Sequence, residues 1–260
     1  MERLIRRCRY FGRHAFTLPI SMKTRLILAW ALSLPGLLFG ADAADAAKRW
    51  EQYEPSFKAF AEADVANPPK KGGILFVGSS IFRQWASVAD DMAPLPVLNR
   101  AFGGSRTADQ LARFAQVVPP YAPKVIVYYC GSNDLKAAAP EDPATIFSRV
   151  RQFSERVQQV QPGTRLIYVS STRSPDRVSR WEQVDHFNAL VRAYCAATPD
   201  HTYVDVNPAL IDHNGHPRLD LYKDDKLHFH PTSYANFTAV IKPVLQRVWN
   251  EVSAAPVGSR

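Results

Sequence analysis

Cysteine is scarce in this sequence, and what is missing excludes several classes of protein. The 260 residues contain three cysteines and no C-x-x-C pair, which excludes a disulfide-stapled scaffold and a cysteine zinc site of the usual spacing. Glycine and proline show no fixed spacing, which excludes a collagen, and no repeat of solenoid period is present. Hydrophobic residues make up 46% and charged residues 22%, which is typical of a globular chain.

The excess of positive charge is concentrated at the N-terminus. The net charge is +8, and residues 1–46, with seven basic and three acidic side chains, carry half of it. The remaining charge is too small to indicate a nucleic-acid partner, and we expect none.

Residues 1–46 have the pattern of an export leader. Met22–Arg25 is a short basic segment, Leu26–Phe39 is an uncharged, mostly apolar run of 14 residues, and small residues with A-x-A spacing follow at Ala41–Ala46. A helix that spans a bilayer needs ~20 residues, so this run is short for an anchor. We expect a signal peptide that starts at Met22, a single mature domain over residues 47–260, no stable membrane insertion after cleavage, and a periplasmic or secreted location. An uncleaved anchor and a cytosolic amphipathic leader are the alternatives.

The mature chain alternates short β-rich segments with stretches of helical spacing. Two of the β-rich segments are continuously apolar, as expected of strands buried on both faces. Asp142-Pro143 predicts the start of one helix and Gln161-Pro162-Gly163 its end. The alternation predicts a three-layer α/β/α sandwich of flavodoxin-like type around a parallel sheet of about five strands. The expected strands are Ile74–Val77, Pro96–Leu98, Val125–Tyr129, Leu166–Ser170 and Tyr203–Val206.

In such a sheet, functional residues gather beyond the C-terminal ends of the strands. Ser80 follows the first expected strand, Gly104 the second and Asn133 the third. Nearer the C-terminus, Asp225 and His228 have the spacing at which a carboxylate can orient an imidazole as a general base. Each of these segments alone is equally typical of a polar turn or a helix cap.

Two further interpretations of these segments stay open at this point. His228 and His230 are two residues apart and follow Asp225, so two imidazoles and a carboxylate could bind a metal ion in place of forming a general base. We expect no metal here. A nucleotide-phosphate loop after the second strand is also conceivable, but the sequence contains neither the dinucleotide fingerprint nor a Walker motif.

In this order, the four segments resemble the SGNH branch of the GDSL hydrolase family over about residues 72–250. The resemblance implies that Ser80 is the nucleophile, His228 its base and Asp225 the residue that orients the base. It also implies an oxyanion hole made by the backbone N–H of Ser80, Gly104 and the side chain of Asn133, with no metal or organic cofactor. The family has Asp where this chain has Ser79, and this departure leaves Ser79 as an alternative nucleophile.

The same resemblance implies a serine hydrolase that cleaves carboxylic esters of short-chain or carbohydrate-linked acyl groups. The alternatives are a lysophospholipase or thioesterase, an O-acetyltransferase acting on an envelope polysaccharide, and an inactive SGNH-like binding module. Arg173, which follows the fourth strand, is the predicted substrate contact. Cys130 and Cys195 have apolar neighbours and are expected to be independent buried thiols. The acyl length and the oligomeric state stay open.

Overall fold

A computed structural model describes residues 50–136 and 140–254. The described residues belong to one compact unit, Ala44–Arg260. The predicted leader, residues 1–46, lies outside the described residues, so the leader and the boundary at residue 47 stay predictions. Within the described residues, no helix is long and apolar enough to cross a membrane.

Five parallel strands form one sheet in the order β2-β1-β3-β4-β5. Strand β1 lies between β2 and β3, with Ile74 opposite Val97 on one side and Val125 on the other. Because parallel neighbours cannot be joined by a tight hairpin, each connection crosses a face of the sheet. The strands are β1 (Ile74–Gly78), β2 (Val97–Asn99), β3 (Val125–Tyr129), β4 (Arg165–Val169) and β5 (His201–Val204).

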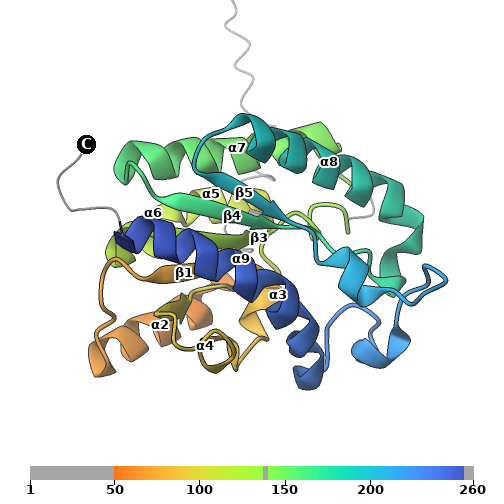
Figure 1. The fold of residues 1–260 in the computed structure, drawn as a ribbon, viewed down its shortest axis with the longest axis horizontal. Coiled ribbons are helices and arrows are strands. Elements are labelled where there is room, and N and C mark those ends of the chain that lie inside the picture. The colour runs from red at the N-terminus through yellow and green to blue at the C-terminus, as the bar shows by residue number, and fades with distance from the viewer. Residues whose placement is uncertain (1–49, 137–139, 255–260) are drawn as a thin grey trace, which may run out of the picture. The chain divides into compact units, whose positions relative to one another are not determined.

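Helices cover both faces of the sheet, which makes three layers (Figure 1). Figure 1 shows α7 and α8 along one face and α9 along the other. The helices are α2 (Glu54–Ala66), α3 (Ser80–Arg83), α4 (Val88–Asp91), α5 (Thr107–Ala112), α6 (Phe114–Val117), α7 (Pro143–Val160), α8 (Trp181–Ala197) and α9 (Tyr234–Ala254). Short 3-10 turns are η1 (Pro119–Tyr121), η2 (Pro175–Arg180), η3 (Asn207–Leu210), η4 (Leu219–Leu221) and η5 (Pro231–Ser233).

Successive side chains of the central strands enter two separate cores. Phe76 and Val127 lie in a core that α9 closes, whereas Leu75 and Ile126 lie in the core beneath α7 and α8. Alternate residues of a strand point to opposite faces, so a sheet covered on both sides needs apolar residues at every position. This double burial explains why β1 and β3 are continuously apolar.

Most of the predicted elements are present, with small shifts at their ends. Helix α7 begins after Asp142, whose Oδ2 accepts hydrogen bonds from the backbone N–H of Ala144 at 3.0 Å and Thr145 at 3.2 Å, and it ends before Gln161. Strand β5 begins at His201, two residues earlier than predicted, and ends before Val206. The start was missed because β5 is an edge strand whose first three side chains are only half-buried, so its polar residues carry no apolar signal.

Candidate active site

Three side chains that are far apart in the sequence form a chain of hydrogen bonds beyond the C-terminal edge of the sheet. The Nε2 of His228 lies 2.9 Å from the Oγ of Ser80, and the Nδ1 of His228 lies 2.6 Å from the Oδ2 of Asp225. A carboxylate at Nδ1 favours the tautomer that carries its proton there, which leaves Nε2 to accept the proton of Ser80. The structure therefore brings together the three residues that the sequence predicted as nucleophile, base and orienting acid.

The turn from β1 into α3 presents Ser80 and buries Ser79. Gly78 has a φ of +149°, and a Cβ on it would lie 2.0 Å from the carbonyl oxygen of Tyr129, so only glycine lets β1 pass β3 here. Ser79 is buried and donates its N–H to the same oxygen at 3.1 Å. Ser80 is half-buried and faces His228. This geometry favours Ser80 over Ser79 as the nucleophile.

Alternating burial orients His228. Leu227 and Phe229 are buried on either side of it, so the imidazole between them points toward Ser80. The Oδ1 of Asp225 accepts the backbone N–H of Leu227 at 3.0 Å and of His228 at 2.9 Å. Partial burial alone would raise the pKa of Asp225, but the hydrogen bonds from His228 and these backbone groups lower it to about 2. Asp225 is therefore ionised at neutral pH and presents a carboxylate to the Nδ1 of His228.

The expected oxyanion side of the site is built from the turns after β2 and β3. Gly104 has a φ of +78°, and no atom lies within 4 Å of the place where its Cβ would be, so the space on this side of the residue is open. The Nδ2 of Asn133 donates to the carbonyl of Ser105 at 3.1 Å, and the Oγ of Ser105 donates to the carbonyl of Gly78 at 3.2 Å. These bonds join the segments that carry Asn133, Gly104 and Ser80. Ser80 begins α3, so its own N–H lacks an intrahelical acceptor.

Asp134 is a residue whose role the sequence did not reveal. Its side chain is buried, and its Oδ1 accepts the hydroxyl of Thr107 at 2.6 Å and the backbone N–H of Thr107 at 3.1 Å. Burial raises the pKa of Asp134 to about 6, although the bonds from Thr107 oppose the shift. Asp134 thus ties the turn that carries Asn133 to the start of α5, beyond Gly104. The position of Asp134 next to Asn133 in the sequence was the one signal that could have indicated this supporting role.

Arg177 is a second residue that the sequence did not single out. Its side chain is only 5% exposed, and its Nη1 donates to the carbonyl of Ser132 at 2.6 Å. The neighbouring Asp176 donates its backbone N–H to the carbonyl of Lys226 at 3.2 Å. The turn η2 therefore links the segment that precedes Asn133 to the loop that holds Asp225 and His228. Because both acceptors are backbone carbonyls of distant segments, no sequence pattern marks these contacts.

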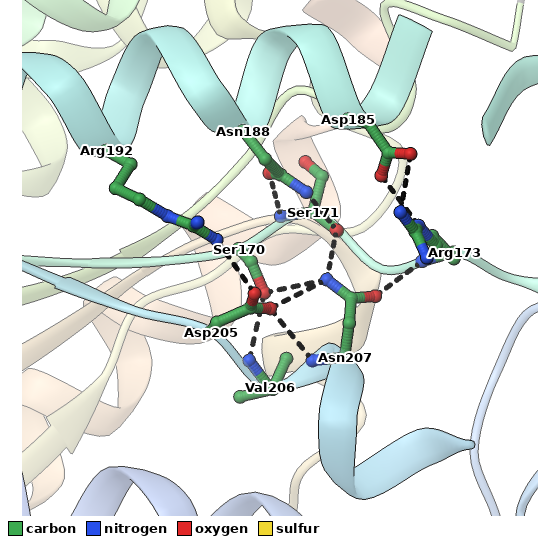
Figure 2. A network of polar contacts seen from close by, with 9 residues as sticks. All are labelled: Ser170, Ser171, Arg173, Asp185, Asn188, Arg192, Asp205, Val206 and Asn207. Carbon is green, nitrogen blue, oxygen red and sulfur yellow. Dashed lines mark hydrogen bonds and ion pairs between the residues drawn. The ribbon is translucent and has the colours of Figure 1, made fainter. Parts of the chain in front are cut away.

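Arg173, the predicted substrate contact, lies in a separate polar network (Figure 2). The Nε and Nη2 of Arg173 donate to the two carboxylate oxygens of Asp185 at 2.6 and 2.5 Å. The backbone N–H of Arg173 donates to the Oδ1 of Asn207 at 2.8 Å. The network lines a hollow of about 270 Å³ that also includes Arg192 and Asp205, which pair at 3.0 Å. The guanidinium of Arg173 is thus already bound by a carboxylate. Its contact with a substrate stays a prediction.

Cys130 and Cys195 are both buried and free. Burial raises the pKa of the Cys130 thiol well above its ordinary range and that of Cys195 to about 12. The expectation of independent buried thiols is confirmed. Within the described ranges, His228 and His230 belong to no group of three side chains that could hold a metal ion.

The sheet order and the helices on both faces define the fold of the SGNH/GDSL class of hydrolases. The model of the GDSL-like lipase/acylhydrolase family matches residues 76–235, and the chain belongs to this family of ester hydrolases. The resemblance drawn from the sequence is thereby confirmed.

Similar proteins agree with this assignment. The chain is 26% identical over 185 residues to platelet-activating factor acetylhydrolase IB subunit alpha1 of Pongo abelii. The aligned region covers 69% of this chain and 78% of the relative. A GDSL-like lipase of Bacteroides thetaiotaomicron has a TM-score of 0.62 at 20% identity, over 74% of this chain and 97% of the other. An acetyl-xylooligosaccharide esterase of Geobacillus Stearmophilus has a TM-score of 0.52 at 14% identity, over 74% and 99%. The solved structures share the fold.

Proposed function

We propose that this ester hydrolase works through an acyl-enzyme on Ser80. The observation that carries the proposal is the pair of contacts made by one imidazole, 2.9 Å to the Oγ of Ser80 and 2.6 Å to the Oδ2 of Asp225. A serine hydroxyl is a weak nucleophile until a neighbouring base takes its proton, and the base acts only when its tautomer and orientation are held. An inactive binding module would have no use for this arrangement.

The reaction has two halves. As the Oγ of Ser80 attacks the ester carbonyl carbon, His228 takes the proton of the hydroxyl, and Asp225 stabilises the charged imidazolium. The carbonyl oxygen becomes an oxyanion, which the N–H groups of Ser80 and Gly104 and the amide of Asn133 stabilise. His228 then gives its proton to the departing alkoxide, which leaves as the alcohol. The acyl group stays on the Oγ of Ser80 as an ester. Water attacks this ester with His228 again as the base, the acid leaves, and Ser80 regains its proton.

Access to the site supports small and soluble ester substrates. Ser80 is half-buried and the side chain of His228 is 20% exposed, so the reacting hydroxyl and base lie near solvent. The similar acetylhydrolase and acetyl-xylooligosaccharide esterase are named for acetyl esters. We therefore assign short acyl groups, including those carried on carbohydrate, to this site, rather than long lipid chains.

The location is a separate part of the proposal. The basic segment, the apolar run and the small residues of the predicted leader support export with cleavage near residue 46. Expression of the full chain in a bacterial host, followed by cell fractionation and N-terminal sequencing, tests this. A periplasmic or secreted product that begins close to residue 47 is expected, and an intact cytosolic chain would contradict it.

Ester turnover tests the function. The purified protein is assayed with p-nitrophenyl acetate, butyrate, octanoate and palmitate beside Ser80→Ala and Ser79→Ala. The proposal predicts turnover that is highest for the short esters, lost in Ser80→Ala and retained in Ser79→Ala. Turnover that survives Ser80→Ala, or that rises toward palmitate, contradicts the nucleophile or the acyl class respectively.

A further inference from the structure

Arg83 lies one turn of helix beyond Ser80 and packs against Gly103, the neighbour of Gly104. A Cβ added to Gly103 would lie 2.5 Å from the Nε of Arg83 and 3.2 Å from its Cζ. The absence of a side chain at Gly103 is therefore what lets the guanidinium lie against this turn. Residues three apart on a helix share a face, so Arg83 and Ser80 project toward the same side of α3.

The guanidinium of Arg83 is not neutralised by the protein. Arg83 is exposed, and the described part of the chain places no carboxylate within ion-pair distance of it. Many of the other arginines are paired: Arg100 with Asp64, Arg149 with Glu141, Arg173 with Asp185 and Arg192 with Asp205. An arginine held by packing yet left without a counter-ion is available to a ligand, because its planar fork fits carboxylate and phosphate groups.

Further positive charge lies on the segments around Arg83. Arg106 lies two residues after Gly104 in the sequence. The Nζ of Lys223 donates a hydrogen bond at 2.7 Å to the Oε1 of Gln84, which is the residue after Arg83. Neither cation has an ion-pair partner among the described residues. The carboxylates on the catalytic loop are Asp224 and Asp225, which are both exposed, and Asp225 is hydrogen-bonded to His228. The rim of the site therefore carries an excess of positive charge.

We propose that Arg83 is a specificity-determining residue that binds an anionic group of the substrate close to the scissile ester. This inference rests on the proposed esterase function and adds the substrate class: esters that carry a carboxylate or phosphate on the acyl or the alcohol part. The cationic rim concentrates such substrates at the site, and the fork of Arg83 makes charge-assisted hydrogen bonds to them.

Matched pairs of neutral and anionic esters test this class. For the acyl side, p-nitrophenyl valerate is compared with mono-p-nitrophenyl glutarate, which has the same chain length and a terminal carboxylate. For the alcohol side, para-acetoxybenzamide is compared with para-acetoxybenzoate. In one of the two pairs the anionic ester is expected to have a kcat/KM about ten to a hundredfold above the neutral one, as a charge-assisted bond implies. The ratio is expected to fall as salt is raised.

Variants assign the preference to Arg83. Arg83→Gln is expected to reduce the anionic-to-neutral ratio toward one, Arg83→Glu to invert it, and Arg83→Lys to retain part of it. Arg247→Gln is the matched control, because Arg247 is an exposed arginine 13 residues along α9, about 20 Å from the helix start beside the site. It is expected to leave the ratio unchanged. Because the ratio is measured within each variant, a general loss of folded enzyme does not affect it.

The outcomes separate this inference from the function on which it rests. Turnover of all four esters with a ratio near one, or a ratio that Arg83→Gln leaves intact, overturns the role of Arg83 while the esterase stands. No turnover of any ester by the folded protein overturns the esterase itself.

Discussion

The Oδ1 of Asp134 lies 2.6 Å from the Oγ1 of Thr107 inside the protein, and the same oxygen accepts the N–H of Thr107 at 3.1 Å. The contact spans 27 residues of sequence and joins the turns that follow β2 and β3. Since these two turns carry Gly104 and Asn133, the separation of the expected oxyanion donors depends on a buried carboxylate that does not itself reach the reacting atoms.

The buried carboxyl of Asp134 makes stability depend on pH. Its folded pKa of about 6 lies above the ordinary 3.8, so the folded state binds the proton more tightly than the unfolded state. This stabilisation is fully present below about pH 4 and is lost as the pH rises through 6. Two pKa units correspond to about 3 kcal/mol. Urea unfolding of the wild type and Asp134→Asn should therefore give a stability difference, wild type minus variant, that falls by about this amount between pH 4 and 7. A difference independent of pH contradicts the buried titration.

Asp225 is expected to matter equally at every working pH. Its pKa of about 2 keeps it ionised throughout, so it does not set the acid limb of the activity profile. Asp225→Asn should lower kcat/KM by about 10³–10⁴-fold from pH 5 to 9, because the imidazole loses its tautomer and its counter-charge. Asp224→Asn, one residue away and exposed, is the control and should have little effect. Equal effects of the two substitutions would remove Asp225 from the mechanism.

Asn133 is expected to act on the rate rather than on substrate binding. Removing one oxyanion donor costs about 10²–10³ in kcat. Asn133→Ala should show this loss with a KM within a few-fold of the wild type, when steady-state kinetics with p-nitrophenyl acetate are compared. A raised KM at unchanged kcat would instead place the amide in ground-state binding.

Two glycines of positive φ should differ in what they tolerate. Gly78 and Gly215 have φ values of +149° and +82°, but only at Gly78 would a Cβ meet backbone, 2.0 Å from the oxygen of Tyr129. Gly215→Ala should cost about 1 kcal/mol of unfolding free energy from backbone strain alone. Gly78→Ala should cost more than about 3 kcal/mol or prevent folding, since β1 and β3 must separate. Similar losses in thermal unfolding would contradict the close approach of the two strands.

Local patterns predicted much of this structure, and contacts between distant segments account for the rest. The apolar runs of β1 and β3, the cap at Asp142 and the spacing of Asp225 and His228 are short-range signals, so these elements lie where they were expected. The meeting of parallel strand ends at one edge predicted where Ser80 lies, whereas its pairing with His228 was implied by the family resemblance.

The supporting contacts were beyond sequence reasoning. Asp134 meets Thr107, Arg177 meets the carbonyl of Ser132, and Arg83 fills the space left by Gly103, each through tertiary packing with no fixed spacing. Arg173 was chosen for its place after β4, but its pairing with Asp185 depends on how α8 crosses the sheet. A position at a strand end predicts proximity to the site and does not predict which partner a side chain takes.

Covalent labelling distinguishes Ser80 from Ser79 as the nucleophile. The protein is treated with a fluorophosphonate, and the modified residue is located by mass spectrometry of the peptide that contains both Ser79 and Ser80. A single adduct on Ser80 is expected, which is lost in Ser80→Ala and forms far more slowly in His228→Ala. An adduct on Ser79, or labelling at Ser80 that is equally fast without His228, would contradict it.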